Sequence, residues 1–224
     1  MLEFFKKYKF FGISLLILSV IFISIFYSIL KPKKVLPVYQ PAQVSTELVD
    51  TTIQYQKKYH KIADFSLVNQ NGKTITQEDY KDKIYVADFF FTTCQTICPI
   101  MTKNMHEVQK AFITDDEVMI LSHTVTPEID TIAQLKRYAK EKNVNASKWN
   151  LVTGDKKQIY ELARKSYLAV KDDGDGGPFD MIHTENFMLI DKERQIRGFY
   201  DGTDMEEVDR LIDDIKILKA SYKQ

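Results

Sequence analysis

The chain of 224 residues contains two cysteines, Cys94 and Cys98, with three residues between them. A disulfide at this spacing closes only a very short loop, and the stabilisation that a disulfide gives grows with the length of the loop. A purely structural bridge therefore has little thermodynamic purpose here. Three alternatives stay open: a redox-active pair, a site for a soft metal ion, and two buried thiols without a chemical role.

Both cysteines follow an apolar and aromatic run, 84–91, which predicts a strand covered on both faces. Apolar residues then recur at helical spacing from Ile97 to Phe112, and Pro99 is tolerated in the first turn of such a helix. We therefore expect the cysteines where a strand ends and a helix begins, which is where α/β sheets place their sites. The positive end of the helix dipole favours thiolate, the form that attacks disulfides and binds Cu(I).

A histidine would add a third ligand and make the site suitable for Cu(II) as well as Cu(I). Three of the four histidines, His60, His106 and His123, are expected to be ordinary solvated or core side chains. His183 differs, because it lies between an acidic, glycine-rich segment, 171–180, and a predicted strand. An imidazole carried by a loop beside a rigid strand could close on a metal ion and release it, so His183 is the strongest candidate.

Strands and helices alternate along the remaining chain. The predicted elements, in order, are a hairpin over 64–76, a strand over 84–91, a helix over 97–112, a strand over 118–121, a helix over 127–142, a strand over 151–153, a helix over 155–168, a hairpin over 187–200 and a last helix that a capping-box pattern starts at Thr203. This alternation predicts an α/β sheet, and the closing antiparallel hairpin makes the sheet mixed.

An apolar segment near the start of the chain, 10–30, is 21 residues long and carries no charge. At about 1.5 Å per residue it spans the roughly 30 Å hydrocarbon core of a membrane. Cleaved signal peptides have shorter apolar regions that end in small residues, so we expect a retained single-pass anchor. The expected organisation is a tail over 1–9, the transmembrane anchor, a linker over 31–59 and an α/β domain over 60–224.

The flanking lysines of the anchor are equal in number on its two sides, so charge does not orient it. We expect the domain to be extracytoplasmic, on the periplasmic side, because the cysteine chemistry fits that compartment. Across the chain, 31 basic residues balance 31 acidic residues. No long-range field attracts a polyanion, which argues against nucleic acid as a partner.

Four segments together resemble a known family. Thr93-Cys-Gln-Thr-Ile-Cys-Pro99 follows an aromatic strand, and His183-Thr-Glu-Asn-Phe-Met-Leu-Ile-Asp191 comes about 85 residues later. Between them, Thr124-Val-Thr-Pro-Glu-Ile-Asp-Thr131 resembles a Ser-Val-Asp-Pro-Glu-Arg-Asp-Thr segment, and Trp149-Asn-Leu-Val-Thr-Gly154 resembles Trp-x-x-Leu-Thr-Gly. From about Ala63 to Leu218 the chain is similar to the Sco/SenC family of membrane-anchored copper proteins.

This resemblance implies a thioredoxin-like fold: a mixed sheet flanked by helices, extended by the amino-terminal hairpin and the transmembrane helix. It implies copper bound by Cys94, Cys98 and His183, and delivery of that copper to the binuclear centre of cytochrome c oxidase subunit II or a similar acceptor. One position departs from the family, because Thr126 stands where the family has Asp. Asp180 is a candidate replacement.

Two functions compete, and a copper-sensing or purely interacting module stays open beside them. The first is a copper metallochaperone, and the second is a thiol-disulfide oxidoreductase that uses Cys94 and Cys98 to keep the cysteines of an acceptor reduced and is itself served by a thioredoxin-like reductant. The chaperone is favoured, because the CxxC spacing of thioredoxin-type reductases is absent and His183 would be superfluous in a reductase. A thiol peroxidase is rejected, since Ala87 and Phe91 occupy the Pro and Thr positions of its pattern.

Overall fold

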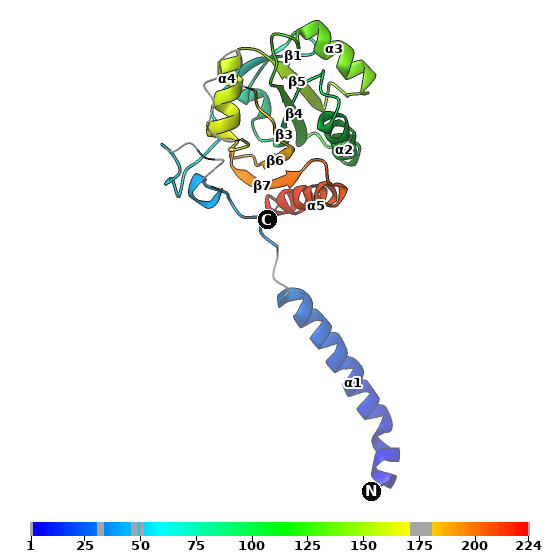
Figure 1. Cartoon of the computed structure of the whole chain (residues 1–224). Coiled ribbons are helices and arrows are strands. Elements are labelled where there is room, and N and C mark those ends of the chain that lie inside the picture. The colour runs from blue at the N-terminus through cyan, green and yellow to red at the C-terminus, as the bar shows by residue number, and fades with distance from the viewer. Residues whose placement is uncertain (1, 31–33, 46–48, 50–51, 171–180, 224) are drawn as a thin grey trace. The chain divides into compact units, whose positions relative to one another are not determined.

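The structure is a computed structural model that describes residues 2–30, 34–45, 49, 52–170 and 181–223. Contacts divide the chain into a unit that ends at Val35 and a second unit that begins at Leu36. The first unit contains one helix, α1 (Leu2–Leu30), drawn in blue in Figure 1. Within it, Tyr8–Tyr27 is long and apolar enough to cross a membrane, which agrees with the predicted anchor.

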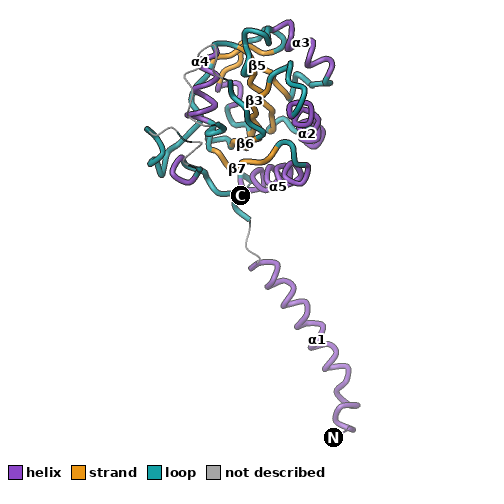
Figure 2. The backbone as a smooth tube through the Cα atoms, in the orientation of Figure 1, coloured by secondary structure: helices purple, strands orange, loops and turns teal. Residues whose placement is uncertain are grey.

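The described part of the second unit contains a seven-stranded mixed sheet in the order β2-β1-β5-β4-β3-β6-β7. The strands, orange in Figure 2, are β1 (Ser66–Asn69), β2 (Thr74–Thr76), β3 (Ile84–Phe90), β4 (Val118–Thr124), β5 (Trp149–Thr153), β6 (Asn186–Ile190) and β7 (Ile196–Asp201). The central strands β3, β4 and β5 run parallel, whereas β1, β6 and β7 each pair antiparallel to their neighbours. The predicted mixed α/β sheet with its amino-terminal hairpin is confirmed.

Helices cover both faces of this sheet. They are α2 (Ile97–Ala111), α3 (Ile132–Glu141), α4 (Lys156–Glu161) and α5 (Met205–Ser221). Successive side chains of β3 point to opposite faces, so Val86 and Phe90 join the core under α2, α3 and α5, while Tyr85 and Phe89 join the core under α4. Figure 1 shows α4 on the side of the sheet opposite α2 and α5.

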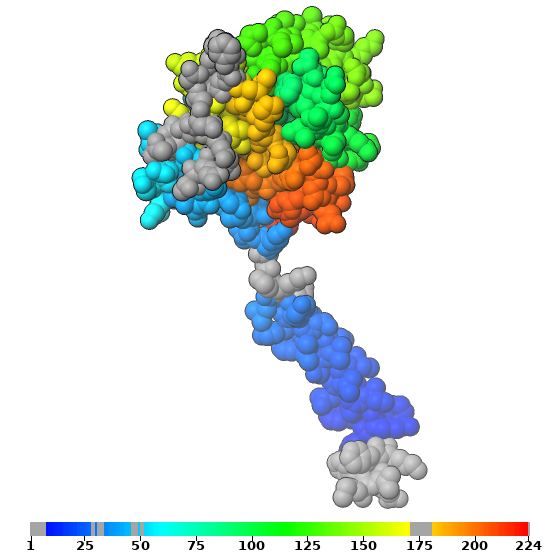
Figure 3. All heavy atoms as spheres, viewed as in Figure 1, coloured from blue at the N-terminus to red at the C-terminus, as the bar shows by residue number. Residues whose placement is uncertain are grey.

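Helices α2 and α3 are neighbours on one face of the domain. The hydroxyl groups of Thr102 and Tyr138 lie 2.8 Å apart and link the two helices. In the space-filling view of Figure 3 their residues, in shades of green, form one continuous surface. The first turn of α2 carries Cys98, so α3 lies near the helix that positions this thiol.

Two helix starts differ from the prediction. Helix α3 begins at Ile132 rather than at 127, because Thr131 caps it by accepting a hydrogen bond from the backbone N–H of Gln134 at 3.3 Å. Helix α5 is capped by Asp204, whose carboxylate accepts from the N–H of Glu206 at 2.9 Å. The predicted cap, Thr203, donates its hydroxyl to another carboxylate instead.

The helix predicted over 155–168 is also divided. Helix α4 ends at Glu161, and the chain continues as a π-helical turn, Leu162–Ser166. The buried residues Leu162 and Ala163 fit the apolar spacing of the predicted helix, and that spacing carries no signal for a single π-helical turn.

The segment before the sheet packs against β7. Leu36 is 5% exposed, and the backbone N–H of Tyr39 donates to the carbonyl oxygen of Ile196 at 2.8 Å. The guanidinium of Arg197 donates to the carbonyl oxygen of Leu36 at 2.7 Å. The start of the compact domain at Leu36 thus lies inside the expected linker, 31–59.

Candidate metal and thiol site

The two cysteines lie where β3 gives way to α2. Cys94 is in the connecting loop and is partly exposed, whereas Cys98 is in the first turn of α2 and is 3% exposed. The backbone N–H of Cys98 donates to the sulfur of Cys94 at 3.4 Å, and both cysteines are free thiols. The predicted position at a strand-to-helix junction is confirmed, and it brings the two sulfurs together.

The two thiols differ in acidity. Partial burial raises the pKa of Cys94, but hydrogen bonds from the thiol and backbone of Cys98 and from Thr96 outweigh it and lower the pKa to about 7. Burial raises the pKa of Cys98 to about 12, and the hydrogen bond that its thiol gives to Cys94 acts in the same direction. At neutral pH the accessible sulfur is therefore substantially thiolate, and the buried one is a thiol.

His183 lies beside the loop that carries the cysteines. Its exposed ring meets the ring of Phe91 edge-on, with centroids 5.9 Å apart, and the carbonyl of Phe91 accepts a hydrogen bond from the N–H of Cys94 at 3.3 Å. Among the residues that the structure describes, no group of three His, Cys, Asp or Glu side chains lies close enough to hold a metal ion. The role of His183 as third ligand stays a prediction, and Asp180 lies outside the described residues.

The other three histidines are packed side chains, as expected: His60 and His123 are buried, and His106 is half-buried. A ring nitrogen of His60 lies 2.8 Å from the carbonyl oxygen of Ser166, and burial lowers the pKa of His60. A ring nitrogen of His106 contacts the carbonyl oxygen of Lys142. His123 is fully buried among aromatic rings, and this burial lowers its pKa to about 4.

A buried carboxylate holds the cysteine loop in place. Asp130 is fully buried and accepts hydrogen bonds from the N–H of Thr92 at 3.1 Å, from the Thr92 hydroxyl at 2.5 Å, from the Thr126 hydroxyl at 3.1 Å and from the Thr124 hydroxyl. Thr92 lies two residues before Cys94, so Asp130 ties this loop to the turn between β4 and α3. The residue that departs from the family pattern, Thr126, is one of its donors.

Sequence reasoning did not identify Asp130 or a second buried carboxyl group, Asp88. Asp88 lies on β3, where burial raises its pKa to about 7 against the lowering effect of the Ser122 hydroxyl that donates to it. Ser122 in turn accepts from the indole N–H of Trp149 at 2.7 Å. The sequence carried a signal for Asp88, because this carboxylate stands inside a run that predicts a strand covered on both faces. A carboxylate in such a strand is expected to be buried, and a buried carboxylate rarely lacks partners.

The sheet is mixed and has helices on both faces, and the cysteine pair lies where a central strand meets a helix. These features define a thioredoxin-like protein with a thiol site. The family model described as SCO1/SenC matches residues 53–219, which is more than half of the chain. The chain belongs to the SCO1/SenC family.

Individual relatives agree with this assignment. The SCO1 protein homolog of Bacillus subtilis (strain 168) is 33% identical over 159 residues, which cover 70% of this chain and 82% of the relative. A structure of BsSco, described as having a disulfide switch and as a member of the Sco family of cytochrome c oxidase assembly proteins, is 32% identical with a TM-score of 0.61 and covers 71% of this chain and 93% of that one. Bradyrhizobium japonicum ScoI, solved with copper bound, is 27% identical with a TM-score of 0.55 and covers 68% and 98%.

Proposed function

We propose that this protein is a membrane-anchored copper metallochaperone that holds Cu(I) or Cu(II) through Cys94, Cys98 and His183. The observation that carries the proposal is the pair of adjacent free thiols beside a ring contact that includes His183. Family membership and the copper-bound relative support copper as the cargo. One apolar helix supports anchoring. The proposal places the domain on the periplasmic side, because the thiol chemistry fits that compartment.

The donor set fits copper. Thiolate and imidazole are the ligands that suit Cu(I) and Cu(II), and a site with three ligands disfavours Zn²⁺, which is almost always four-coordinate in structural sites. Cys94 offers its thiolate near neutral pH, whereas Cys98 must lose its proton as the metal binds. Metal uptake therefore releases a proton, and its affinity rises with pH.

The acceptor in this proposal is the binuclear copper centre of cytochrome c oxidase subunit II or a similar copper site. The description of BsSco as a member of a family of cytochrome c oxidase assembly proteins supports this class of partner. A shallow site with few ligands can pass copper by ligand exchange, because an incoming thiolate or imidazole of the acceptor replaces one ligand at a time. The partly exposed Cys94 is the ligand that such an exchange reaches first.

A thiol-disulfide oxidoreductase is the second candidate, and the contrast in exposure between the two cysteines favours it. The Cys94 thiolate attacks one sulfur of the acceptor's disulfide and forms a mixed disulfide, which releases the other acceptor sulfur as a thiolate. The deprotonated sulfur of Cys98 then attacks Cys94 and releases the second acceptor thiolate. Two electrons pass to the acceptor, and a thioredoxin-like reductant returns the oxidised pair to two thiols.

Titration with Cu(I) tests the proposal. The anaerobically reduced full chain in detergent is titrated against a competing chelator, as the parent and as Cys94→Ser, Cys98→Ser and His183→Ala. Met181→Ala is the matched control, because this side chain is exposed and lies two residues before His183. The proposal expects one-to-one binding that weakens in the three ligand variants and is unchanged in the control.

Two outcomes oppose the copper proposal. If His183→Ala binds Cu(I) as the parent does and the chain still reduces an acceptor disulfide, the oxidoreductase is the correct function. If the oxidised protein, with Cys94 and Cys98 joined, binds Cu(I) as tightly as the reduced protein, the sulfurs are not ligands.

A further inference from the structure

A basic and aromatic segment, 55–61, lies at the surface of the domain before the sheet begins. Its two tyrosines are almost fully exposed, Tyr55 at 80% and Tyr59 at 85%. It also contains three exposed lysines, Lys57, Lys58 and Lys61. In Figure 3 the residues in cyan, which include this basic segment, lie on the outside of the domain. Exposed aromatic rings interleaved with ammonium groups are a surface that can bind a partner.

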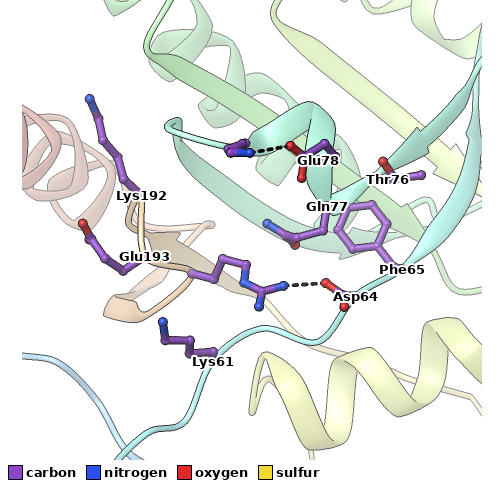
Figure 4. Close-up of a pocket in the computed structure, with 10 residues that line it drawn as sticks. Lys61, Asp64, Phe65, Thr76, Gln77, Glu78, Lys192 and Glu193 are labelled. Atoms are coloured by element: carbon purple, nitrogen blue, oxygen red, sulfur yellow. Dashed lines mark hydrogen bonds and ion pairs between the residues drawn. The ribbon is translucent and has the colours of Figure 1, made fainter.

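The positive charge of the basic segment has no local counter-charge. Residues 52–63 contain no acidic side chain, and the three lysines form no ion pair with any residue that the structure describes. The next acidic residue along the chain, Asp64, pairs with Arg194 at 2.5 Å (Figure 4). Glu193, beside Arg194, accepts a hydrogen bond from the hydroxyl of Tyr222 at 2.5 Å. The three lysines are therefore available to an anionic partner, although the chain as a whole is neutral.

Hydrogen bonds join the basic segment to the place where the chain enters the domain. The backbone N–H of Ala42 donates to the carbonyl oxygen of Gln56 at 3.1 Å. The backbone N–H of His60 donates to the side-chain oxygen of Gln40 at 2.9 Å. The compact unit begins at Leu36, a few residues before these contacts. The basic segment is thus fixed next to the entry point of the chain.

This entry point is at the end of the sheet that is remote from the cysteines. The N–H of Ile62 donates to the carbonyl oxygen of Arg194 at 2.9 Å, and Tyr39 pairs with Ile196, so both segments contact the turn between β6 and β7. That turn follows the end of β6, which pairs with the start of β3. The cysteines follow the other end of β3, roughly 20 Å away at about 3.3 Å per residue.

The covalent chain limits how far this end of the domain can be from a membrane. Helix α1 ends at Leu30, and the chain from Leu30 to Leu36 spans at most about 20 Å when fully extended. Tyrosine is enriched at the interface between a membrane and water, and lysine near an anionic lipid surface is attracted to it. The backbone of Tyr59 has a φ of 67°, which is rare for a bulky residue, while its neighbour His60 is buried. An exposed ring held in a rare conformation indicates a function at the surface.

We propose that the basic segment binds the anionic headgroups of the bilayer that holds α1. The three lysines pair with lipid phosphates, and the rings of Tyr55 and Tyr59 enter the headgroup layer. Docking at this end of the sheet directs the thiol site, at the other end of β3, away from the bilayer and toward a partner in the aqueous phase. The docking rests on the membrane anchor of the proposed function and is independent of copper binding.

Amide hydrogen exchange of the full chain in lipid nanodiscs tests the proposal. One set of discs contains phosphatidylcholine alone, and the other contains phosphatidylcholine and phosphatidylglycerol in equal parts. Exchange of residues 52–61 is expected to be at least about fivefold slower in the anionic discs, because each lysine near an anionic surface favours docking by about a factor of five. About 1 M salt should remove this slowing, since the Debye length then falls to about 3 Å.

Variants separate the basic segment from general attraction to the lipid. Lys57→Gln combined with Lys58→Gln should reduce the slowing to less than about twofold. The matched control is Lys136→Gln combined with Arg137→Gln, which removes two exposed cations of α3 on the opposite face of the sheet and should keep the slowing of the parent. Exchange in the buried strand β4 should be the same in every variant, which shows that the fold is intact.

The outcomes distinguish docking from anchoring. Tyr55→Ser combined with Tyr59→Ser should also weaken the slowing in anionic discs, because the rings leave the headgroup layer. Equal exchange of residues 52–61 in the two kinds of disc would refute docking while the chain still co-eluted with the discs. An equal loss of slowing in the control pair would refute the basic segment as the site. A chain that did not co-elute with either kind of disc would refute the anchor, and the docking with it.

Discussion

Replacement of Asp130 by asparagine tests whether this carboxylate positions the proposed copper ligands. The substitution keeps the shape of the side chain but removes its charge and turns one acceptor oxygen into a donor. Four donors point at the carboxylate, two from Thr92 and one each from Thr124 and Thr126. Hydrogen bonds to charged groups contribute about 1 kcal/mol more than neutral ones, and the lower cost of burying a neutral group offsets part of the sum.

We therefore expect Asp130→Asn to lower the free energy of unfolding by about 3 kcal/mol. For a domain of this size, such a change lowers the Tm by about 6–12 °C. Because Thr92 lies two residues before Cys94, release of the loop also means that copper binding must order it again. Ordering about one backbone residue costs about 1.4 kcal/mol, which makes Cu(I) binding about tenfold weaker.

The assay pairs thermal unfolding of the reduced, metal-free protein with Cu(I) competition against a chelator. Asp213→Asn is the control, because this carboxylate is 70% exposed and forms only a surface ion pair with Lys216. A Tm within about 1 °C of the parent would show that the network does not stabilise the turn. A lower Tm with unchanged Cu(I) affinity would restrict Asp130 to a structural role and refute its positioning of the ligands.

Four further perturbations have defined outcomes. Alkylation of the reduced protein is followed by mass spectrometry as a function of pH. The rate of modification of Cys94 should have its midpoint near pH 7, and Cys98 should stay unmodified up to about pH 10. A shared midpoint near pH 9 would contradict these pKa values. The same shifts give the two thiols opposite effects on the pH dependence of the free energy of unfolding, measured in denaturant. The stabilisation from Cys94 is present above its unfolded pKa near 9 and is lost as the pH falls toward 7. The stabilisation from Cys98 is present below pH 9 and is lost as the pH rises toward 12. Arg197→Met leaves the fully buried carboxylate of Asp191 without its cation, so the free energy of unfolding is expected to fall by about 3 kcal/mol. Arg197 also holds the carbonyl oxygen of Leu36, so proteolysis before residue 40 should be faster, and unchanged digestion would show that Arg197 does not hold this segment. Gly202→Ala places a Cβ 2.6 Å from an aromatic ring of β6, so unfolding in denaturant should show a loss of about 1–3 kcal/mol, and a neutral effect would mean that the ring can move aside.

The elements of the sheet could be predicted from the sequence because their burial follows simple periods. Residues 84–91 are apolar except for Asp88, since both faces of β3 are covered, and the cysteine pair could be placed because a helical pattern follows directly. The start of α3 could not be predicted in the same way. Residues before Ile132 donate hydrogen bonds to the side chains and backbone of their neighbours. The spacing of apolar residues does not predict those hydrogen bonds.

Side-chain partners that come from distant segments were beyond sequence reasoning. The pairing of Asp130 with Thr92 joins residues 38 positions apart, and the contact between His183 and Phe91 joins segments that only the fold brings together. Resemblance to a family indicated His183, whereas neither spacing nor resemblance indicated the partners of Asp130.

The segment that begins at Leu36 also determines how far the protein can be shortened. Strand β7 is at one edge of the sheet, and the backbone of Tyr39 pairs with Ile196 on that edge. A soluble fragment that began at residue 60 would lose this cover and would leave Arg197 without the carbonyl oxygens of Leu36 and Pro37. An uncovered edge strand is a template for pairing with another chain, so such a fragment would self-associate, whereas one that began before Leu36 would stay dispersed.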